Sequence, residues 1–493
     1  MSMPDSFEHM PSVVIRMPNG ALSSLAGNLD PHHRVAVADL VLVQRRVRAT
    51  IERLVQEFAP DVVGLTVMTF QRPTAKKIIR LLRSLLPRVR IVLGGYDPSL
   101  APEAYSAEGE EAVDFIVRSE GEPAFRELLR ALEKGSGFAD IPGLSFRSGD
   151  RFEHNSARPV QKLEAGELRL PNRNARVLRG YTMLGRQVDV LETSRGCTFD
   201  CSFCSIIEMR GRNFHLFPLE RVIEDIRDAH RHGARALFIV DDNITLNIQR
   251  FEALCEAILS AGLNRIDYYV QGMTSAIATH GARLAPLMKR AGFRYVFLGI
   301  ENMDEKNLKF LHATAKNTTR DGGVAGGNAT LRAIKLLHDN GMYVVGGLIV
   351  GNPDDTTASI QANLDMAGRY IDWPYIQHPM PYPRTPMTKD FADQGLIAHN
   401  RVEEYDGTTA VVRTKHVDGE EVEYLRWKAE RWMKLRHFPV ALRHNPWFVL
   451  RHSPKMMAHT FRGSRLKTWL GLEDERHAFR RFRAMRETER NYL

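Results

Sequence analysis

Two successive series of alternating strand and helix patterns constrain the fold of this 493-residue chain. In residues 12–135, short apolar runs typical of buried parallel strands alternate with amphipathic stretches such as 47–58 and 74–86. This alternation predicts an α/β fold that begins with a doubly wound, Rossmann-like sheet, where ligands bind at the carboxyl ends of the strands. The expected strands of this first series are 12–15, 34–40, 61–67, 89–95 and 114–117.

The second series contains six strand–helix units between residues 189 and 380. Six units predict a partial (β/α)6 barrel, whose active site lies at the carboxyl ends of its strands. Its expected strands are 189–194, 236–242, 266–272, 295–301, 342–350 and 375–381. We therefore expect an N-terminal domain over 1–139, a connector over 140–185, a partial barrel over 186–400 and a helical region over 401–493.

Three of the four cysteines follow the first expected barrel strand, with the spacing Cys-x3-Cys-x2-Cys at Cys197, Cys201 and Cys204. Thiolates are the usual ligands of iron–sulfur clusters, and three of them leave one iron of a [4Fe–4S] cubane without a protein ligand. A zinc site is the alternative, and it would need a fourth ligand such as His215. Cys255 lies on the apolar face of an expected helix, as a core cysteine does.

The cysteine spacing, with Phe203 before the last cysteine, resembles the signature of the radical S-adenosylmethionine (SAM) superfamily. Residues 60–103 and 118–132 resemble the cobalamin-binding domain of class B radical SAM enzymes, a branch that includes the hopanoid methylases and related cobalamin-dependent methyltransferases. The resemblance implies that the open iron of the cluster binds SAM. Reductive cleavage of SAM would then yield a 5′-deoxyadenosyl radical, with cobalamin as a further cofactor.

The resemblance also implies which residues bind these cofactors, although it assigns no catalytic residue. Arg195 and Arg210 flank the cysteine loop and would pair either with the SAM carboxylate or with nearby acids. Asp97 and Ser119 depart from the family pattern, which often has His and Gly there. The implied SAM contacts are Asp241, Asp242, Asn243, Gln271, Glu301, Gly347 and Gly351, and the implied cobalamin contacts are Thr66, Thr69, Gly94, Gly95, Tyr96, Glu120, Gly121 and Glu122.

By this resemblance we expect an enzyme that methylates an unactivated carbon of a small or lipid-like metabolite. An electron donor such as flavodoxin or ferredoxin would reduce its cluster. Two alternatives remain open at this point. One is a radical SAM cyclase, isomerase or C–C coupling enzyme whose N-terminal domain does not use methylcobalamin. The other is a non-catalytic cobalamin or iron–sulfur sensor.

The C-terminal region carries most of the net charge of +9, because residues 426–493 alone sum to +11. Basic residues mixed with Trp, Phe and Leu are typical of helices that lie on a membrane surface. A helical cap with a solvated basic face is the alternative, and nucleic-acid binding is disfavoured because no RNA-binding module is recognisable. No apolar run approaches the roughly 18 residues that span a bilayer, so we expect a cytoplasmic protein, peripheral to the membrane at most.

Overall fold

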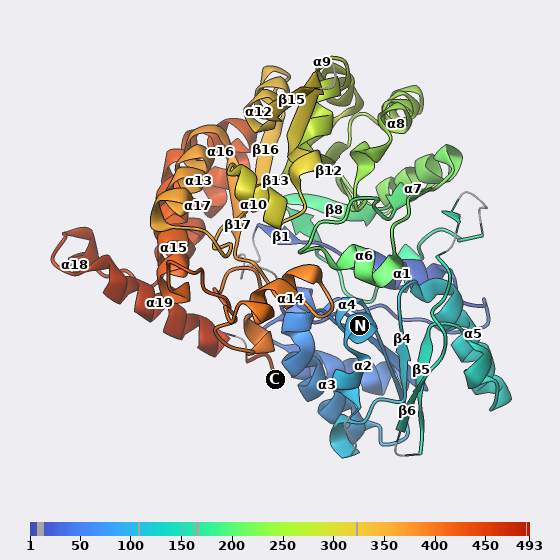
Figure 1. Cartoon of the computed structure of the whole chain (residues 1–493). Helices are drawn as coiled ribbons and strands as arrows, with labels where there is room; N and C mark the ends of the chain where they lie inside the picture. The colour runs from blue at the N-terminus through green and yellow to red at the C-terminus, as the bar shows by residue number, and fades with distance from the viewer. Residues whose placement is uncertain are drawn as a thin grey trace.

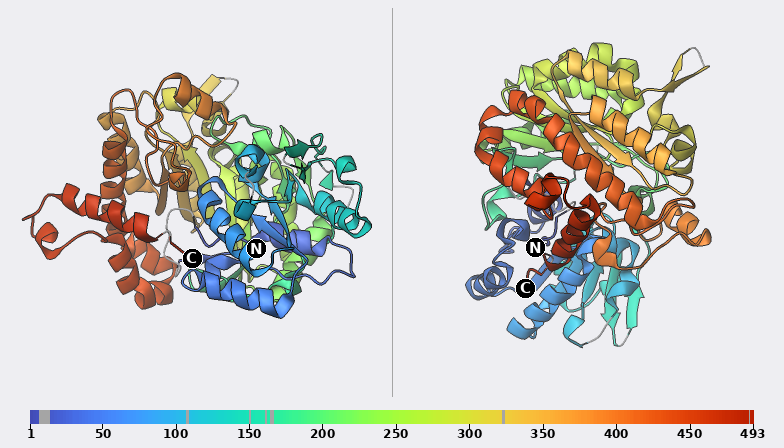
Figure 2. Two further views of the ribbon diagram at one scale, coloured as in Figure 1. Left: turned by 90° about the horizontal axis from the view of Figure 1, so that it is seen from below. Right: turned by 90° about the vertical axis from the view of Figure 1, so that its left-hand side faces the viewer.

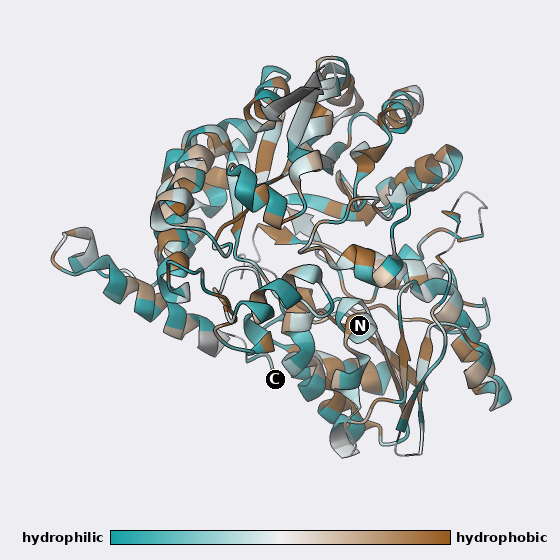
Figure 3. Ribbon diagram, viewed as in Figure 1, coloured by the Kyte–Doolittle hydropathy of each residue, from teal (hydrophilic) through white to brown (hydrophobic). Residues whose placement is uncertain are grey.

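The computed structural model describes residues 1–6, 14–106, 109–149, 151–160, 162–163, 167–321, 324–489 and 491–493. Two β-sheets, each covered by helices, lie next to each other, and a group of C-terminal helices packs on the edge of the larger sheet (Figure 1). Apolar residues gather along the strands of both sheets, whereas the outer helices carry hydrophilic faces (Figure 3). The α/β architecture expected from the two strand–helix series is therefore confirmed.

The larger sheet is the expected partial barrel. Six of its strands run parallel in the order β8-β11-β12-β13-β16-β17, and two short antiparallel strands, β1 and β7, extend it beyond β8. Helices cover its outer face. The strands are β1 Ile15–Arg16, β7 Thr182–Met183, β8 Arg186–Leu191, β11 Ala236–Ile239, β12 Asp267–Met273, β13 Phe293–Glu301, β16 Tyr343–Ile349 and β17 Trp373–Gln377. The covering helices are α7 Leu219–Arg231, α8 Ile248–Ser260, α9 Thr274–Ala291, α12 Thr330–Asp339 and α13 Thr357–Tyr370.

Alternate side chains of the barrel strands face the helices and the barrel lumen, as the two-residue period of a strand requires. Tyr268 packs into the core beneath the helices, whereas Tyr269 packs in a separate cluster with the tyrosines of neighbouring strands. The ring of Tyr269 stacks on that of Tyr295 with centroids 4.5 Å apart, and Tyr343 follows at 5.1 Å. These tyrosines fill the lumen near the amino ends of the strands. Two residues further along β12, Gln271 is only half-buried, so the lumen opens toward the carboxyl ends.

The smaller sheet has the order β2-β3-β4-β5-β6, in which β2, β3 and β4 run parallel and β5 and β6 are antiparallel additions. Both of its faces are covered by apolar clusters. Its strands are β2 Val62–Thr66, β3 Arg90–Gly94, β4 Phe115–Val117, β5 Leu144–Ser148 and β6 Arg151–His154, and the N-terminal helices are α1 Gly20–Gly27, α2 Val47–Phe58, α3 Arg72–Leu85, α4 Tyr96–Leu100 and α5 Gly121–Lys134.

Two of the five strands expected in this sheet do not join it. Residues 12 and 13 lie outside the described residues, and Ile15 pairs with Met183 in the barrel sheet instead. The expected strand 34–40 forms only isolated bridges, because Ser2 lies between Asp39 and the edge strand β2. The places of these strands are taken at the opposite edge by β5 and β6, which come from the expected connector.

The C-terminal helices cover the open edge of the barrel and its amino end. Helix α15 packs against α13 and β17, and the ring of Phe448 on α17 lies against Gly185 at the turn that precedes β8 (Figure 2). The amide of Asn445 donates to the Tyr295 hydroxyl of the tyrosine layer. The helices of this region are α14 Pro386–Asp393, α15 Gly419–Arg436, α16 Phe438–His444, α17 Pro446–Thr460, α18 Leu466–Trp469 and α19 Glu475–Glu489.

Candidate functional site

The three clustered cysteines lie on one loop between β8 and the short helix α6 (Ser205–Arg210). The loop starts with a sharp turn at Gly196, whose φ of +91° and close approach to Asn213 leave no room for a side chain. Cys201 is buried and Cys197 and Cys204 are half-buried, and none is in a disulfide. Burial raises the pKa of Cys201 to about 11 and that of Cys204 to about 12. Buried thiols of this kind become thiolates when they bind a metal, so the loop fits a [4Fe–4S] cluster.

Two aspartates after β11 hold the cysteine loop in place. Asp241, 1% exposed, accepts hydrogen bonds from the Thr193 amide at 2.6 Å and the Ser194 hydroxyl at 2.7 Å. Asp242 accepts one from the Gly196 amide at 2.7 Å. Burial raises the pKa of Asp241 to about 6. Because donors of the loop already surround the Asp241 carboxylate, this side chain positions the loop, a role that the sequence analysis did not assign to it.

The remaining expected SAM contacts lie along the carboxyl ends of the neighbouring strands. Asn243 is buried next to the loop, with its amide nitrogen 3.9 Å from the Cys197 sulfur. Gln271 and Glu301 end β12 and β13. A Cβ on Gly347 would lie 2.7 Å from the Phe297 ring, so this glycine makes room for a phenylalanine, and Gly351 adopts a φ of +98°.

One ion pair in this region was missed by the sequence analysis. The Lys316 ammonium lies 3.1 Å from the Glu301 carboxylate, and both side chains are mostly buried. Lys316 belongs to a short helix, α11 (Thr314–Asn317), that follows α10 (Glu305–Phe310). Neither helix has a periodic apolar pattern long enough to signal its position, so only the folded chain brings Lys316 to the site.

A second set of charges joins the cysteine loop to the smaller sheet. Arg195 donates to Glu122 at 2.7 Å and to Glu192 at 2.6 Å, and Glu120 is 3.8 Å away. Ser24 also donates to Glu122. Burial would raise the pKa of Glu122, but the charge and hydrogen bonds of Arg195 outweigh it and lower the pKa to about 2. Of the two partners left open for Arg195, the structure shows the nearby acids.

Arg210 also faces an acid, since its guanidinium is 3.5 Å from Asp242. The two residues that depart from the family pattern have structural explanations. Asp97 is fully buried and makes a bidentate ion pair with Arg72 at 2.8 Å. Ser119 adopts a left-handed φ of +65°, the conformation that favours glycine, and its hydroxyl donates to the Met209 carbonyl of α6 at 3.0 Å.

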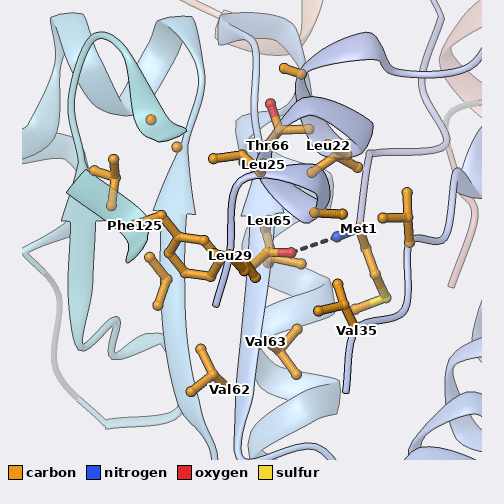
Figure 4. Close-up of a pocket in the computed structure, with 18 of the residues that line it drawn as sticks. Met1, Leu22, Leu25, Leu29, Val35, Val62, Val63, Leu65, Thr66 and Phe125 are labelled. Carbon is orange, nitrogen blue, oxygen red and sulfur yellow. Dashed lines mark hydrogen bonds between the residues drawn. The ribbon is translucent and has the colours of Figure 1, made fainter. Parts of the chain in front are cut away.

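A cavity of about 960 Å³ extends from the smaller sheet to the cysteine loop. Its apolar part lies between α1, α5 and β2, where Leu22, Leu25, Leu65 and Phe125 surround it (Figure 4). Its polar part reaches the barrel, where its lining includes Glu192, Arg195, Met209 and Arg210. The expected cobalamin contacts that line it are Thr66, Gly94, Gly95, Tyr96, Glu120, Gly121 and Glu122, whereas Thr69 is buried elsewhere.

The shape of this cavity fits a large ligand with a flat face and an apolar tail. At Gly95, with a φ of +99°, a Cβ would lie 2.8 Å from the Thr66 hydroxyl. At Gly121, a Cβ would lie 3.1 Å from Leu25. The chain therefore turns closely around the cavity at both glycines. The apolar part would hold a nucleotide tail, and the polar part would place a corrin ring against the cysteine loop.

Comparisons with known protein families agree with both halves of this arrangement. Residues 191–367 match the Radical SAM superfamily, and residues 13–129 match the B12 binding domain. An uncharacterized methyltransferase of Pyrococcus horikoshii is 28% identical over 411 residues, which cover 83% of this chain and 86% of that protein. The hopanoid C-3 methylase of Methylococcus capsulatus is 28% identical over 280 residues, which cover 56% of this chain and 52% of the methylase.

A further relative is the anaerobic magnesium-protoporphyrin IX monomethyl ester cyclase of Cereibacter sphaeroides, 26% identical over 447 residues, covering 87% of this chain and 67% of the cyclase. Two solved structures share the fold. One is TsrM from Kitasatospora setae with cobalamin and a [4Fe–4S] cluster bound, with a TM-score of 0.62, 22% identity and coverage of 80% and 77% of the two chains. The other is OxsB with aqua-cobalamin and S-adenosylmethionine bound, with a TM-score of 0.65, 17% identity and coverage of 97% and 74%.

Proposed function

The chain belongs to the radical SAM enzymes that carry a B12-binding domain, and we propose that it methylates an unactivated carbon of a small or lipid-like metabolite. When bound, the cluster and SAM supply a 5′-deoxyadenosyl radical, and cobalamin supplies the methyl group. The observation that carries the proposal is the single cavity lined both by Gly94, Gly95 and Tyr96 and by Arg195 and Arg210 next to the cysteines.

The residues of this chain would hold the two halves of the site at a fixed separation. Cys197, Cys201 and Cys204 would hold the cluster. The bonds from Arg195 to Glu122 and from Ser119 to Met209 join the cavity wall to the loop and to α6. A methyl group on the ligand of the cavity would thereby face the lumen of the barrel. Asn243, Gln271 and Glu301 remain the proposed SAM contacts.

The names of the relatives support methyl transfer over the other chemistries. One relative is described as a methyltransferase over most of both chains, and the hopanoid enzyme methylates a lipid. The cyclase similarity supports a radical cyclisation as the second candidate. We propose that flavodoxin or ferredoxin delivers the electron that this chemistry needs.

The first experiment is anaerobic reconstitution with iron and sulfide, followed by incubation with hydroxocobalamin, a reductant and SAM labelled in its methyl group. We expect about four irons and one retained cobalamin per chain, release of 5′-deoxyadenosine, and label on the cobalamin. Cys201→Ala should abolish 5′-deoxyadenosine release. Cys255→Ala, at a fully buried cysteine of α8, is the matched control and should not.

Three other results would change the conclusion. Release of 5′-deoxyadenosine without retained cobalamin would favour the cyclase or isomerase candidate. Cobalamin retained without label would contradict methyl transfer from SAM to cobalamin. The absence of 5′-deoxyadenosine from the wild type would favour a sensor.

We also propose that the C-terminal helices attach the protein to an anionic membrane surface. Residues 432–472 contain eight Lys or Arg and no Asp or Glu. One face of α17 is exposed along its length, with Trp447 84% and Leu450 61% exposed. The basic residues Arg451 and Lys455 continue the same face at helical spacing. Amphipathic helices of this kind bind anionic lipid headgroups, whereas no helix in the described part of the chain is long and apolar enough to cross a membrane.

The geometry favours attachment by the end of the barrel that lies away from the cysteines. Helix α17 packs its other face, through Phe448, against the turn before β8. Sedimentation with phosphatidylcholine vesicles, with and without phosphatidylglycerol, tests this contact. We expect binding only to the anionic vesicles, and loss of binding when Trp447 and Leu450 are both replaced by Ser. Leu331→Ser, at a 44% exposed leucine of α12, is the matched control. Equal binding of both variants would contradict the proposal.

A further inference from the structure

Lys316 is a charged side chain in the wall of the cysteine loop. Only 16% of its side chain is exposed, and its ammonium lies 5.9 Å from the centroid of the Phe203 ring, between Cys201 and Cys204 in sequence. The same ammonium acts on the Cys201 thiol through its charge and through a hydrogen bond, and on Cys204 through its charge. A single lysine therefore faces two of the three expected cluster ligands.

The chain builds this position with two unusual backbone features. Glu301, which holds the Lys316 ammonium at 3.1 Å, adopts a left-handed φ of +59° although it is not a glycine. At Gly299, a Cβ would lie 2.7 Å from the Glu301 carboxylate and 3.6 Å from the ammonium. The glycine thus leaves space for the ion pair, and the strained glutamate directs its carboxylate toward the lysine.

The ion pair keeps the ammonium charged in this environment. Burial would lower the pKa of Lys316, but the charges of Glu301 and Cys201 outweigh it and raise the pKa above its usual range. On both thiols the lysine has the larger influence. Among the charges that act on Cys201, Lys316 precedes Glu301, and Glu301 does not contribute appreciably at Cys204. The sulfurs of the loop therefore experience a net positive field from the pair.

We propose that Lys316, fixed by Glu301, raises the reduction potential of the [4Fe–4S] cluster held by Cys197, Cys201 and Cys204. The inference rests on the cluster of the proposed function. Reduction adds one electron from an external donor, so the cluster and its thiolates become more negative by one charge. A nearby ammonium stabilises that added charge, and potentials of iron–sulfur clusters respond to local charge and to hydrogen bonds on the sulfurs. The lysine would make the cluster easier to reduce before SAM is cleaved.

The test is a potentiometric titration of the reconstituted protein, followed by electron paramagnetic resonance in the absence of SAM. Lys316→Met should shift the midpoint potential to a more negative value, because the positive charge is lost. Glu301→Gln should shift it the opposite way, because the ammonium is then uncompensated. Lys316→Arg keeps the charge and should lie closer to the wild type than Lys316→Met does.

A structural role for the lysine predicts other results. Lys316→Met leaves the Glu301 carboxylate buried without its partner, so this variant risks losing its fold or its cluster. The double variant Lys316→Met with Glu301→Gln removes both charges. It should keep the iron content of the wild type and still titrate below it, since the ammonium acts more strongly on the thiols.

Two outcomes would overturn the inference. Unchanged midpoints in Lys316→Met and in the double variant, with weaker SAM binding, would make Lys316 a contact of SAM instead. A wild type that assembles no cluster would remove the proposed function as well, whereas a cluster that assembles but does not respond to Lys316 would contradict this inference alone.

Discussion

Arg195, two residues before the first cysteine of the loop, donates a hydrogen bond to Glu122 of the smaller sheet at 2.7 Å. Both side chains are almost fully buried. This pair belongs to neither sheet alone, because Arg195 lies on the barrel side and Glu122 is in the first turn of α5. The relative position of the cysteine loop and the large cavity therefore depends on one buried interaction.

Replacing Glu122 by Gln should destabilise the protein markedly. Arg195 would keep Glu192 as a close partner but lose its charged partner across the domains. Breaking a buried ion pair from one side costs about 3 kcal/mol or more. The urea midpoint at pH 7 would fall accordingly. Asp30→Asn breaks an exposed pair with Arg130 and serves as the control, because solvent screens such pairs. Equal midpoint shifts in the two variants would show that the buried pair has no special role.

The Asp241 carboxylate should make the stability of the protein depend on pH. Its pKa rises from the usual 3.8 to about 6 on folding, so the folded state binds its proton more tightly than the unfolded state does. The stability from this proton is complete below pH 3.8 and is lost as the pH rises through 6. Two pKa units correspond to about 3 kcal/mol.

Comparison with Asp241→Asn isolates this contribution, since asparagine does not titrate. The difference in unfolding free energy between wild type and variant should change by about 3 kcal/mol between pH 4 and pH 7, with the wild type losing stability as the pH rises. Other titrating groups cancel in the difference. Parallel pH profiles would mean that the carboxylate does not change its pKa on folding.

The periodicity of the sequence predicted most strands because it depends on local residues. The six parallel barrel strands and β2, β3 and β4 lie where apolar runs were expected. The strand expected at 12–15 differs, since Ile15 pairs with Met183 in the other sheet. Local hydrophobicity identifies an extended segment, but not the sheet edge to which it adds.

The same limit applies to the candidate site. The cysteines and seven of the cobalamin contacts could be predicted, because they follow strands at a common sheet edge. The pairs Lys316–Glu301 and Arg72–Asp97 could not, since each joins residues that are distant in sequence and have no shared motif. Asp241 was identified, but its hydrogen bonds to Thr193 and Ser194 give it a supporting role that spacing does not reveal.

Ser119 combines backbone strain with a stabilising bond, and substitutions can separate the two. Ser119→Ala removes the hydrogen bond to the Met209 carbonyl and keeps a side chain at a φ of +65°. It should cost about 1 kcal/mol of unfolding free energy. Ser119→Gly loses the same bond but relieves strain of about 1 kcal/mol, so it should be the more stable variant. Urea denaturation compares the two. A glycine variant less stable than the alanine variant would argue that the strain is negligible.

Gly95 offers a direct test of the cavity wall. Gly95→Ala places a Cβ 2.8 Å from the Thr66 hydroxyl and 2.9 Å from the Val67 carbonyl, at a φ of +99°. Gly135→Ala is the matched control, because Gly135 also has a positive φ of +74° but no neighbouring atom within 4 Å of the added Cβ. Both variants incur backbone strain of about 1 kcal/mol, and only Gly95→Ala adds a steric clash. Gly95→Ala should therefore have the lower urea midpoint and retain less cobalamin after desalting than Gly135→Ala. If the two variants retain cobalamin equally, the wall at Gly95 does not contact the ligand.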